Sequence, residues 1–131
     1  MNSPSFLASS VLVALGGAIG SWLRYAVSRM ISPARAADFP WATLTANVLG
    51  SFAMGLLVGW LARHSDGGEQ WRLLLGVGVL GGFTTFSAFA MEFAQLAQKG
   101  ALATAALYVA TSLVAGIAGL FLGLAVMRGA T

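Results

Sequence analysis

The sequence predicts an all-α membrane protein, and its composition and its apolar runs support this fold class. Of the 131 residues, 58% are hydrophobic and only 8% are charged, whereas soluble domains carry about 25% charged residues. Four apolar runs follow one another, and each has the roughly 20 residues that cross a bilayer as a helix. We place these spans at about residues 6–31, 41–62, 73–97 and 101–127, so that residues 1–131 form a single transmembrane domain.

The first apolar run is expected to remain in the mature protein as a helix. It has no basic residues ahead of it, is long, and passes through Arg24 without a clear small-residue cleavage site. A secretory signal peptide would have a basic start, a shorter apolar core and such a site. The chain is therefore expected to cross the membrane several times, and the membrane that we expect is the cell inner membrane.

Short connections and glycine pairs indicate how the spans pack. The connections cover about residues 32–40, 63–72 and 98–100, so consecutive spans are expected to be antiparallel neighbours. Each span also contains two glycines four positions apart, a spacing that lets helix backbones approach closely in lipid. The pairs are Gly16 with Gly20, Gly55 with Gly59, Gly78 with Gly82, and Gly119 with Gly123.

The third span is interrupted at its centre. Between Gly76 and Glu92 the sequence GVGVLGGFTTFSAFAME places glycines and a Thr-Thr-Phe-Ser cluster where lipid favours Leu and Val. Backbone that leaves the helix at membrane depth is tolerated only inside protein or beside a wet cavity. We therefore predict a broken third helix and interpret the break as part of an ion or substrate path.

Basic residues are distributed evenly between the two sides of the membrane. Arg63, Arg72 and Arg128 share the side of the N-terminus, whereas Arg29, Arg35 and Lys99 lie on the other. The positive-inside rule therefore gives little preference for one orientation. A short chain can show such a balance by chance. The interpretation that we favour is insertion in both orientations and pairing as an antiparallel, dual-topology homodimer.

The net charge of +3 would point to nucleic acid in a soluble protein. Here the basic residues flank the membrane spans, so they indicate lipid headgroups of the bilayer and no nucleic acid.

Polar residues form stripes on two of the spans. Residues four positions apart share a helix face, and the stripes are Thr43, Asn47 and Ser51, and Thr104, Tyr108 and Ser112. Hydrogen bonding between helices would explain the hydroxyl residues, and for Ser51 and Thr104 this alternative stays open. Asn47 favours a functional role because its carboxamide brings two donors and two acceptor lone pairs into the membrane.

An aromatic stripe follows the break, formed by Phe83, Phe86, Phe89 and Phe93. Such stripes usually reflect packing. A ring edge, however, carries the positive end of the aromatic quadrupole, so a phenylalanine placed edge-on to a path can favour an anion. Glu92 near the end of this span and Arg24 late in the first span are expected to be either interfacial anchors or pore-end residues.

Enzymatic activity is not expected. The single histidine, His64, lies in a connection, as do all acidic residues other than Glu92, and the chain has no cysteine. No arrangement of nucleophile, base and orienting residue can be assembled, and no metal-ligand spacing occurs. A transport pathway or a purely structural membrane subunit remains.

Three motifs and one spacing carry a resemblance to a known family. They are GGAIGSWLRY at Gly16–Tyr25, WATLTANVLGSF at Trp41–Phe52, GGFTTFSAFAMEF at Gly81–Phe93, and the spacing of Tyr108 and Ser112. Over essentially its full length the chain resembles the Fluc fluoride channels, also called the CrcB family. The resemblance implies an antiparallel dimer of four-helix subunits with two pores, through which fluoride leaves the cytoplasm passively and fluoride resistance results.

The resemblance also implies roles for particular residues. Asn47, Phe86 and Phe89 would line the fluoride path, and the hydroxyl-rich wall would be Thr43, Tyr108 and Ser112. A structural Na⁺ at the dimer interface would be held by the backbone carbonyls of Gly81 and Thr84 from both subunits. A serine that continues the wall in some members is replaced by Gly116 here.

Two other functions remain as alternatives. Small multidrug resistance proteins, which exchange drugs or metabolites for protons, share the length, the four spans and the dual topology. Such an antiporter needs a titratable carboxylate in the first span, and this sequence has none. A subunit without any transport function would leave Asn47 and the helix break unexplained.

Overall fold

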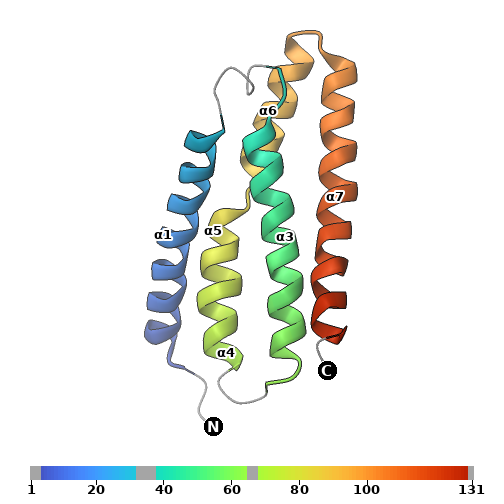
Figure 1. Cartoon of the computed structure of the whole chain (residues 1–131). Coiled ribbons are helices and arrows are strands. Elements are labelled where there is room, and N and C mark those ends of the chain that lie inside the picture. Colours follow the sequence, from blue (N-terminus) through green and yellow to red (C-terminus); the bar gives the residue numbers. More distant parts are fainter. Residues whose placement is uncertain (1–3, 32–37, 65–67, 130–131) are drawn as a thin grey trace.

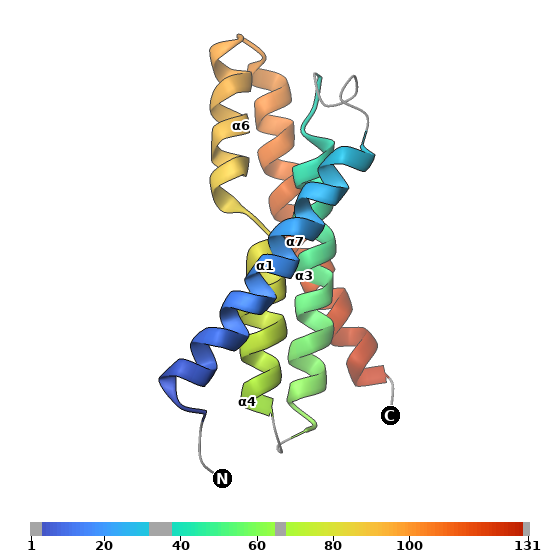
Figure 2. The same cartoon turned by 90° about the vertical axis from the view of Figure 1, so that its left-hand side faces the viewer.

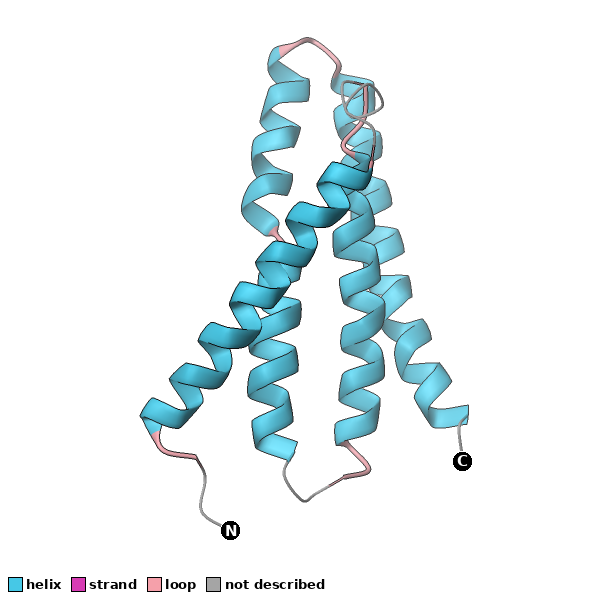
Figure 3. Cartoon of the chain, turned by 60° about the vertical axis from the view of Figure 1, so that its left-hand side comes forward, coloured by secondary structure: helices cyan, strands magenta, loops and turns pink. Residues whose placement is uncertain are grey.

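The computed structural model describes residues 4–31, 38–64 and 68–129, and the regular structure in these ranges is entirely helical (Figures 1 and 3). Four helical segments are long and apolar enough to cross a membrane, which confirms the predicted fold class. They are α1 (Phe6–Met30), α3 (Trp41–Leu61), a composite third span (Gly68–Gln98) and α7 (Leu102–Gly129).

The third span starts earlier than the apolar pattern predicts, at Gly68 instead of about residue 73. It consists of α4 (Gly68–Trp71), the π-helix η1 (Arg72–Leu80), α5 (Gly81–Phe83) and α6 (Phe86–Gln98). Arg72 donates from Nη2 to Glu69 Oε1 over 2.7 Å across the first turn. An acidic residue at a helix start and an ion pair at this spacing both favour the helix, so these polar residues extend the span.

The predicted break lies between α5 and α6, about halfway along the third span (Figure 3). Thr84 has φ −84° and ψ 155°, and Thr85 has φ −151° and ψ 125°. Both residues are extended, so the helical hydrogen-bond ladder stops at α5 and begins again at α6.

The spans run antiparallel as expected and consecutive spans touch, but the largest contacts join non-consecutive spans. α1 packs along η1 and α5, and α3 packs along α7, whereas α1 and α3 touch only slightly (Figure 1). The first span thus pairs with the third, and the second with the fourth. Short connections determine the direction of a helix, but the surfaces that fit decide its partner.

Glycines form the contact between α1 and the first half of the third span. A Cβ atom at Gly16 would lie 2.9 Å from Gly78 Cα, and one at Gly82 would lie 2.6 Å from Gly17 O. A Cβ atom at Gly20 would collide with the carbonyl oxygen of Val79. The glycine spacing therefore marks a close backbone contact, as the sequence predicts.

The contact between α3 and α7 is built in the same way. A Cβ atom at Gly123 would lie 3.0 Å from Gly55 Cα, and one at Gly59 would lie 2.6 Å from the Cβ of Met127. These two glycine-lined contacts hold the lower part of the molecule in Figure 1 together.

Above the break, α6 diverges from α1 and lies beside α7 (Figure 2). A tight turn joins the two helices, in which Gly100 adopts φ 78° and Ala101 N–H donates to Leu96 O over 2.9 Å. Glycine suits this left-handed position at a helix end because it has no Cβ. The buried side chains of Leu44, Leu96, Ala105 and Tyr108 form a core here.

The start of α1 and the end of α7 lie at the same end of the molecule (Figure 1). Arg63, Arg72 and Arg128 lie at this end and Arg29 and Lys99 at the other, because the spans alternate in direction. Arg35 lies outside the described residues.

Candidate functional site

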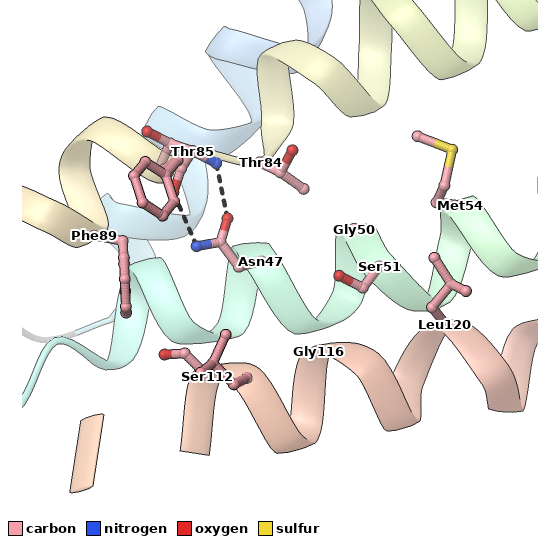
Figure 4. Close-up of a pocket in the computed structure, with 12 residues that line it drawn as sticks. Asn47, Gly50, Ser51, Met54, Thr84, Thr85, Phe89, Ser112, Gly116 and Leu120 are labelled. Carbon is pink, nitrogen blue, oxygen red and sulfur yellow. Dashed lines mark hydrogen bonds between the residues drawn. The ribbon is translucent and has the colours of Figure 1, made fainter. Parts of the chain in front are cut away.

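Asn47 on α3 clamps the helix break. Its Nδ2 group donates to Thr85 O over 3.0 Å, and its Oδ1 accepts from Thr85 N–H over 2.8 Å (Figure 4). The backbone N–H can only donate, so the carboxamide oxygen must face it. The carboxamide thus satisfies both polar groups of a residue that has left the helix, which membrane burial requires.

The break takes helical donors away from several carbonyl groups, including those of Gly81 and Thr84. In a continuous helix Gly81 O would accept from Thr85 N–H, and Thr84 O would accept from Ala88 N–H. Thr85 N–H donates to Asn47 instead, and Ala88 N–H donates to Thr85 Oγ1 over 3.2 Å. Gly81 O and Thr84 O are also the two carbonyl groups that the family resemblance assigns to a cation.

Arg24 contacts the break from the side of α1. Its Nε–H donates to Gly82 O over 3.2 Å, and its side chain lines a separate hollow between α1, α3 and α6 together with Thr43 and Glu92. Gly82 O would otherwise depend on Phe86 N–H, which lies beyond the break. Arg24 therefore has a structural partner inside the bundle as well as access to this hollow.

Glu92 joins the two polar stripes. Its Oε1 accepts from Thr43 Oγ1 and its Oε2 from Tyr108 OH, both over 2.7 Å, and Tyr108 is fully buried. This connection is not among the contacts expected from the sequence, although an acidic residue within a span is itself a signal for an interior partner. Consequently the hydroxyl groups of Thr43 and Tyr108, expected in a pore wall, are directed to a carboxylate.

A cavity of about 340 Å³ lies between α3, α7 and the break (Figure 4). Among its lining residues are Asn47, Thr84, Phe86, Phe89 and Ser112. The structure therefore brings five of the predicted site residues around one cavity. Thr43, Tyr108 and Glu92 are not part of its lining, and they lie closer to the turn between α6 and α7.

The two phenylalanine rings differ in their surroundings. Their centroids are 5.7 Å apart, and Phe89 also lies 5.1 Å from the ring of Tyr108. Phe89 packs against the core, whereas Phe86 is 79% exposed. In a single chain the Phe86 side chain is therefore open to whatever lies beside this face.

Ser112 on α7 has a buried hydroxyl group without a hydrogen-bond partner in the described part of the chain. A buried polar group of this kind needs a ligand or water to offset its desolvation. Ser112 therefore marks the cavity as a place for a polar occupant.

These features define a class, that of small multi-pass helical membrane proteins with a span broken beside a polar cavity. Within this class the chain belongs to the CrcB family, because the model described as "CrcB-like protein, Camphor Resistance (CrcB)" matches residues 11–124. This confirms the resemblance drawn from the three sequence motifs.

Named relatives in several bacteria agree with this assignment. The chain is 56% identical to the fluoride-specific ion channel FluC of Novosphingobium aromaticivorans over 125 residues, which cover 94% of this chain and 98% of the relative. It is 49% identical to the protein of the same name in Agrobacterium fabrum, over 89% of this chain and 94% of the relative. The FluC of Caulobacter vibrioides is 50% identical, over 90% and 94%.

Proposed function

We propose that this protein is a fluoride-selective channel that lets fluoride leave the cytoplasm passively through the cell inner membrane and so confers fluoride resistance. Its membership of the CrcB family and its similarity to proteins named fluoride-specific ion channels support this function. The observation that carries the proposal is the cavity at the break, which has hydroxyl and amide groups and two phenylalanine rings but no carboxylate among its lining residues.

The chemistry of this cavity suits a small anion. Moving a bare ion into an apolar medium costs on the order of tens of kcal/mol, so hydrogen-bond donors must replace the water around fluoride. Asn47 has one carboxamide N–H without a partner in the described ranges, and Ser112 has an unpaired hydroxyl. The positive edges of Phe86 and Phe89 can add to these donors, and a narrow path excludes larger halides.

The antiporter alternative is not supported. α1 has no acidic residue that could exchange a proton, and the named relatives are described as ion channels. Transport without a chemical reaction accounts for the site.

We also propose that Gly81 and Thr84 hold Na⁺ through their backbone carbonyls. These are hard oxygen ligands, and both carbonyls have lost their helical donors to Asn47 and Thr85. A cation bound there would supply a fixed positive charge that offsets the desolvation of an anion nearby. Two carbonyl ligands from one chain are too few to surround a cation, so this proposal requires the same two carbonyls from a second copy of the chain.

An antiparallel homodimer is the proposed assembly. The balance of basic residues allows both orientations, and the 79% exposure of Phe86 leaves part of the path uncovered in one chain. A two-fold axis in the membrane plane would bring two breaks together and give two equivalent pores.

The main test is halide release from proteoliposomes that contain the purified protein, measured with fluoride and chloride electrodes. Fluoride is expected to leave and chloride to stay. Phe86→Ile and Phe89→Ile remove the ring edges and are expected to slow fluoride release without disrupting the dimer. Equal release of both halides, or none from well-folded protein, would overturn the proposed function.

The cation and the assembly have tests of their own. Prolonged replacement of Na⁺ by a larger organic cation is expected to abolish fluoride release, and full activity afterwards would exclude a required Na⁺. Two or three lysines added at the C-terminus should force one orientation and abolish function, and a partner with the opposite bias should restore it. Labelling of wild-type termini from only one side of the membrane would exclude dual topology.

A further inference from the structure

Ser51 is the member of the α3 polar stripe that has no role so far. The other two members are engaged, Thr43 with Glu92 and Asn47 with Thr85. The Ser51 hydroxyl makes no hydrogen bond to any residue that the structure describes. Serine hydroxyls within helices commonly donate to a carbonyl one turn earlier, and Ser10 in α1 does so, to Phe6 O over 2.8 Å.

Ser51 lines the same cavity as Ser112, whose hydroxyl also has no partner among the described residues. The two side chains come from the facing helices α3 and α7 (Figure 4). Beyond them the cavity is lined by the apolar side chains of Met54 and Leu120. The two serines are therefore the last hydroxyl groups on that side of the break.

Gly116 on α7 lies opposite Ser51 on α3 in the cavity lining. A Cβ atom at Gly116 would lie 3.7 Å from Ser51 Oγ, which is ordinary van der Waals contact. The α7 wall thus offers no side chain next to Ser51, and it has room for one. Ser51 therefore provides a hydroxyl group from α3 at a level of the cavity where Gly116 of α7 has no side chain.

We propose that Ser51 is a fluoride ligand, and that its hydroxyl, together with that of Ser112, forms a donor subsite next to Asn47. This inference rests on the proposed channel function and extends the path along α3. A small anion accepts hydrogen bonds from both hydroxyls, which are free to rotate toward it. Without an occupant the buried Ser112 hydroxyl would lie unpaired in a membrane-embedded cavity, which is costly, and the Ser51 hydroxyl would have no partner among the described residues.

The test compares fluoride release from proteoliposomes for variants that remove the Ser51 hydroxyl, keep it, or replace it with one from α7. Ser51→Ala removes it and is expected to slow release by about tenfold, the scale of one hydrogen bond to a charged group. Ser51→Thr keeps the hydroxyl and should retain most activity. Ser51→Ala combined with Gly116→Ser returns a hydroxyl from α7 and should restore release. Thr111→Val is the control, because Thr111 lies on α7 next to Ser112 but lines a different hollow.

The outcomes separate this inference from the proposed function. Release by Ser51→Ala at the wild-type rate would overturn the role of Ser51 while the channel function stands. Slow release that neither Ser51→Thr nor Gly116→Ser recovers would show a packing role instead and would also overturn it. A wild-type protein that releases no fluoride would overturn the channel function itself. Elution volume and thermal unfolding of each variant confirm that the compared proteins are folded.

Discussion

The two halves of the third span are held by different kinds of contact. Below the break, η1 and α5 lie against α1, and glycines bring the backbones together, as at Gly78 and Gly16. Above the break, α6 lies against α7 and α3, and the carboxylate of Glu92 accepts hydrogen bonds from both of these helices. One span therefore changes its partner halfway through the bundle.

The comparison shows what the break accomplishes. A continuous helix with the first half fixed on α1 would carry its second half along α1 as well. Two extended residues, Thr84 and Thr85, allow the second half to leave α1 and approach α7 instead. Some of the polar groups released by this change of direction find new partners, because Asn47 pairs with the Thr85 backbone and Arg24 with the Gly82 carbonyl. The break, its clamp and the cavity are thus parts of one arrangement.

The largest loss of stability is expected from a substitution in the glycine-lined contact between α1 and the first half of the third span. Gly20→Ala places a Cβ atom against the Val79 carbonyl, and backbone on both sides limits relaxation. We expect a loss of about 3 kcal/mol or more in the free energy of unfolding, at the upper end for overpacked sites. Thermal unfolding in detergent measures the change.

Gly17→Ala is the control for this prediction. Gly17 lies in the same helix, and nothing approaches within 4 Å of its added Cβ atom. Alanine favours a helix over glycine by about 0.5–1 kcal/mol, so stability should be unchanged or higher. Equal destabilisation by the two variants would contradict the close backbone contact.

An intermediate effect is expected at the clamp. Asn47→Asp replaces the amide that donates to Thr85 O with an acceptor, so two oxygen atoms face each other. The unpaired carbonyl costs about 1–3 kcal/mol, and a negative charge enters the proposed anion path. Fluoride release should fall sharply while the dimer stays intact. Wild-type release from folded Asn47→Asp protein would exclude Asn47 from the path.

The smallest effect is expected in the hydrogen-bonded half. Tyr108→Phe removes one of the two hydroxyls that contact Glu92, and Thr43 remains as a donor. The loss should be about 1.5 kcal/mol, the lower end of the range for a hydrogen bond to a charged group, as measured by thermal unfolding. Tyr25→Phe, on a largely exposed ring of α1, is the control. A Tyr108→Phe variant as unstable as Gly20→Ala would show that the polar contacts dominate the fold.

The four spans, the break in the third and the close helix contacts could all be predicted from the amino-acid sequence. Length, apolar content and glycine spacing are local properties, and lipid demands helices wherever the chain crosses it. The three motifs also determined the family. Residues such as Asn47 and Ser112 could be singled out because polar groups are rare and costly inside a membrane.

The pairing of the helices and the contacts of the polar residues could not be predicted from the sequence, because they depend on how the helices pack. The connections permit α1 to lie beside α3, but the backbone fit between Gly16 and Gly78 places it beside the third span. Glu92 could not be linked to Thr43 and Tyr108 in advance, because the link depends on the direction that α6 takes after the break. Hydrogen-bond partners far apart in sequence follow from packing, which no local pattern encodes.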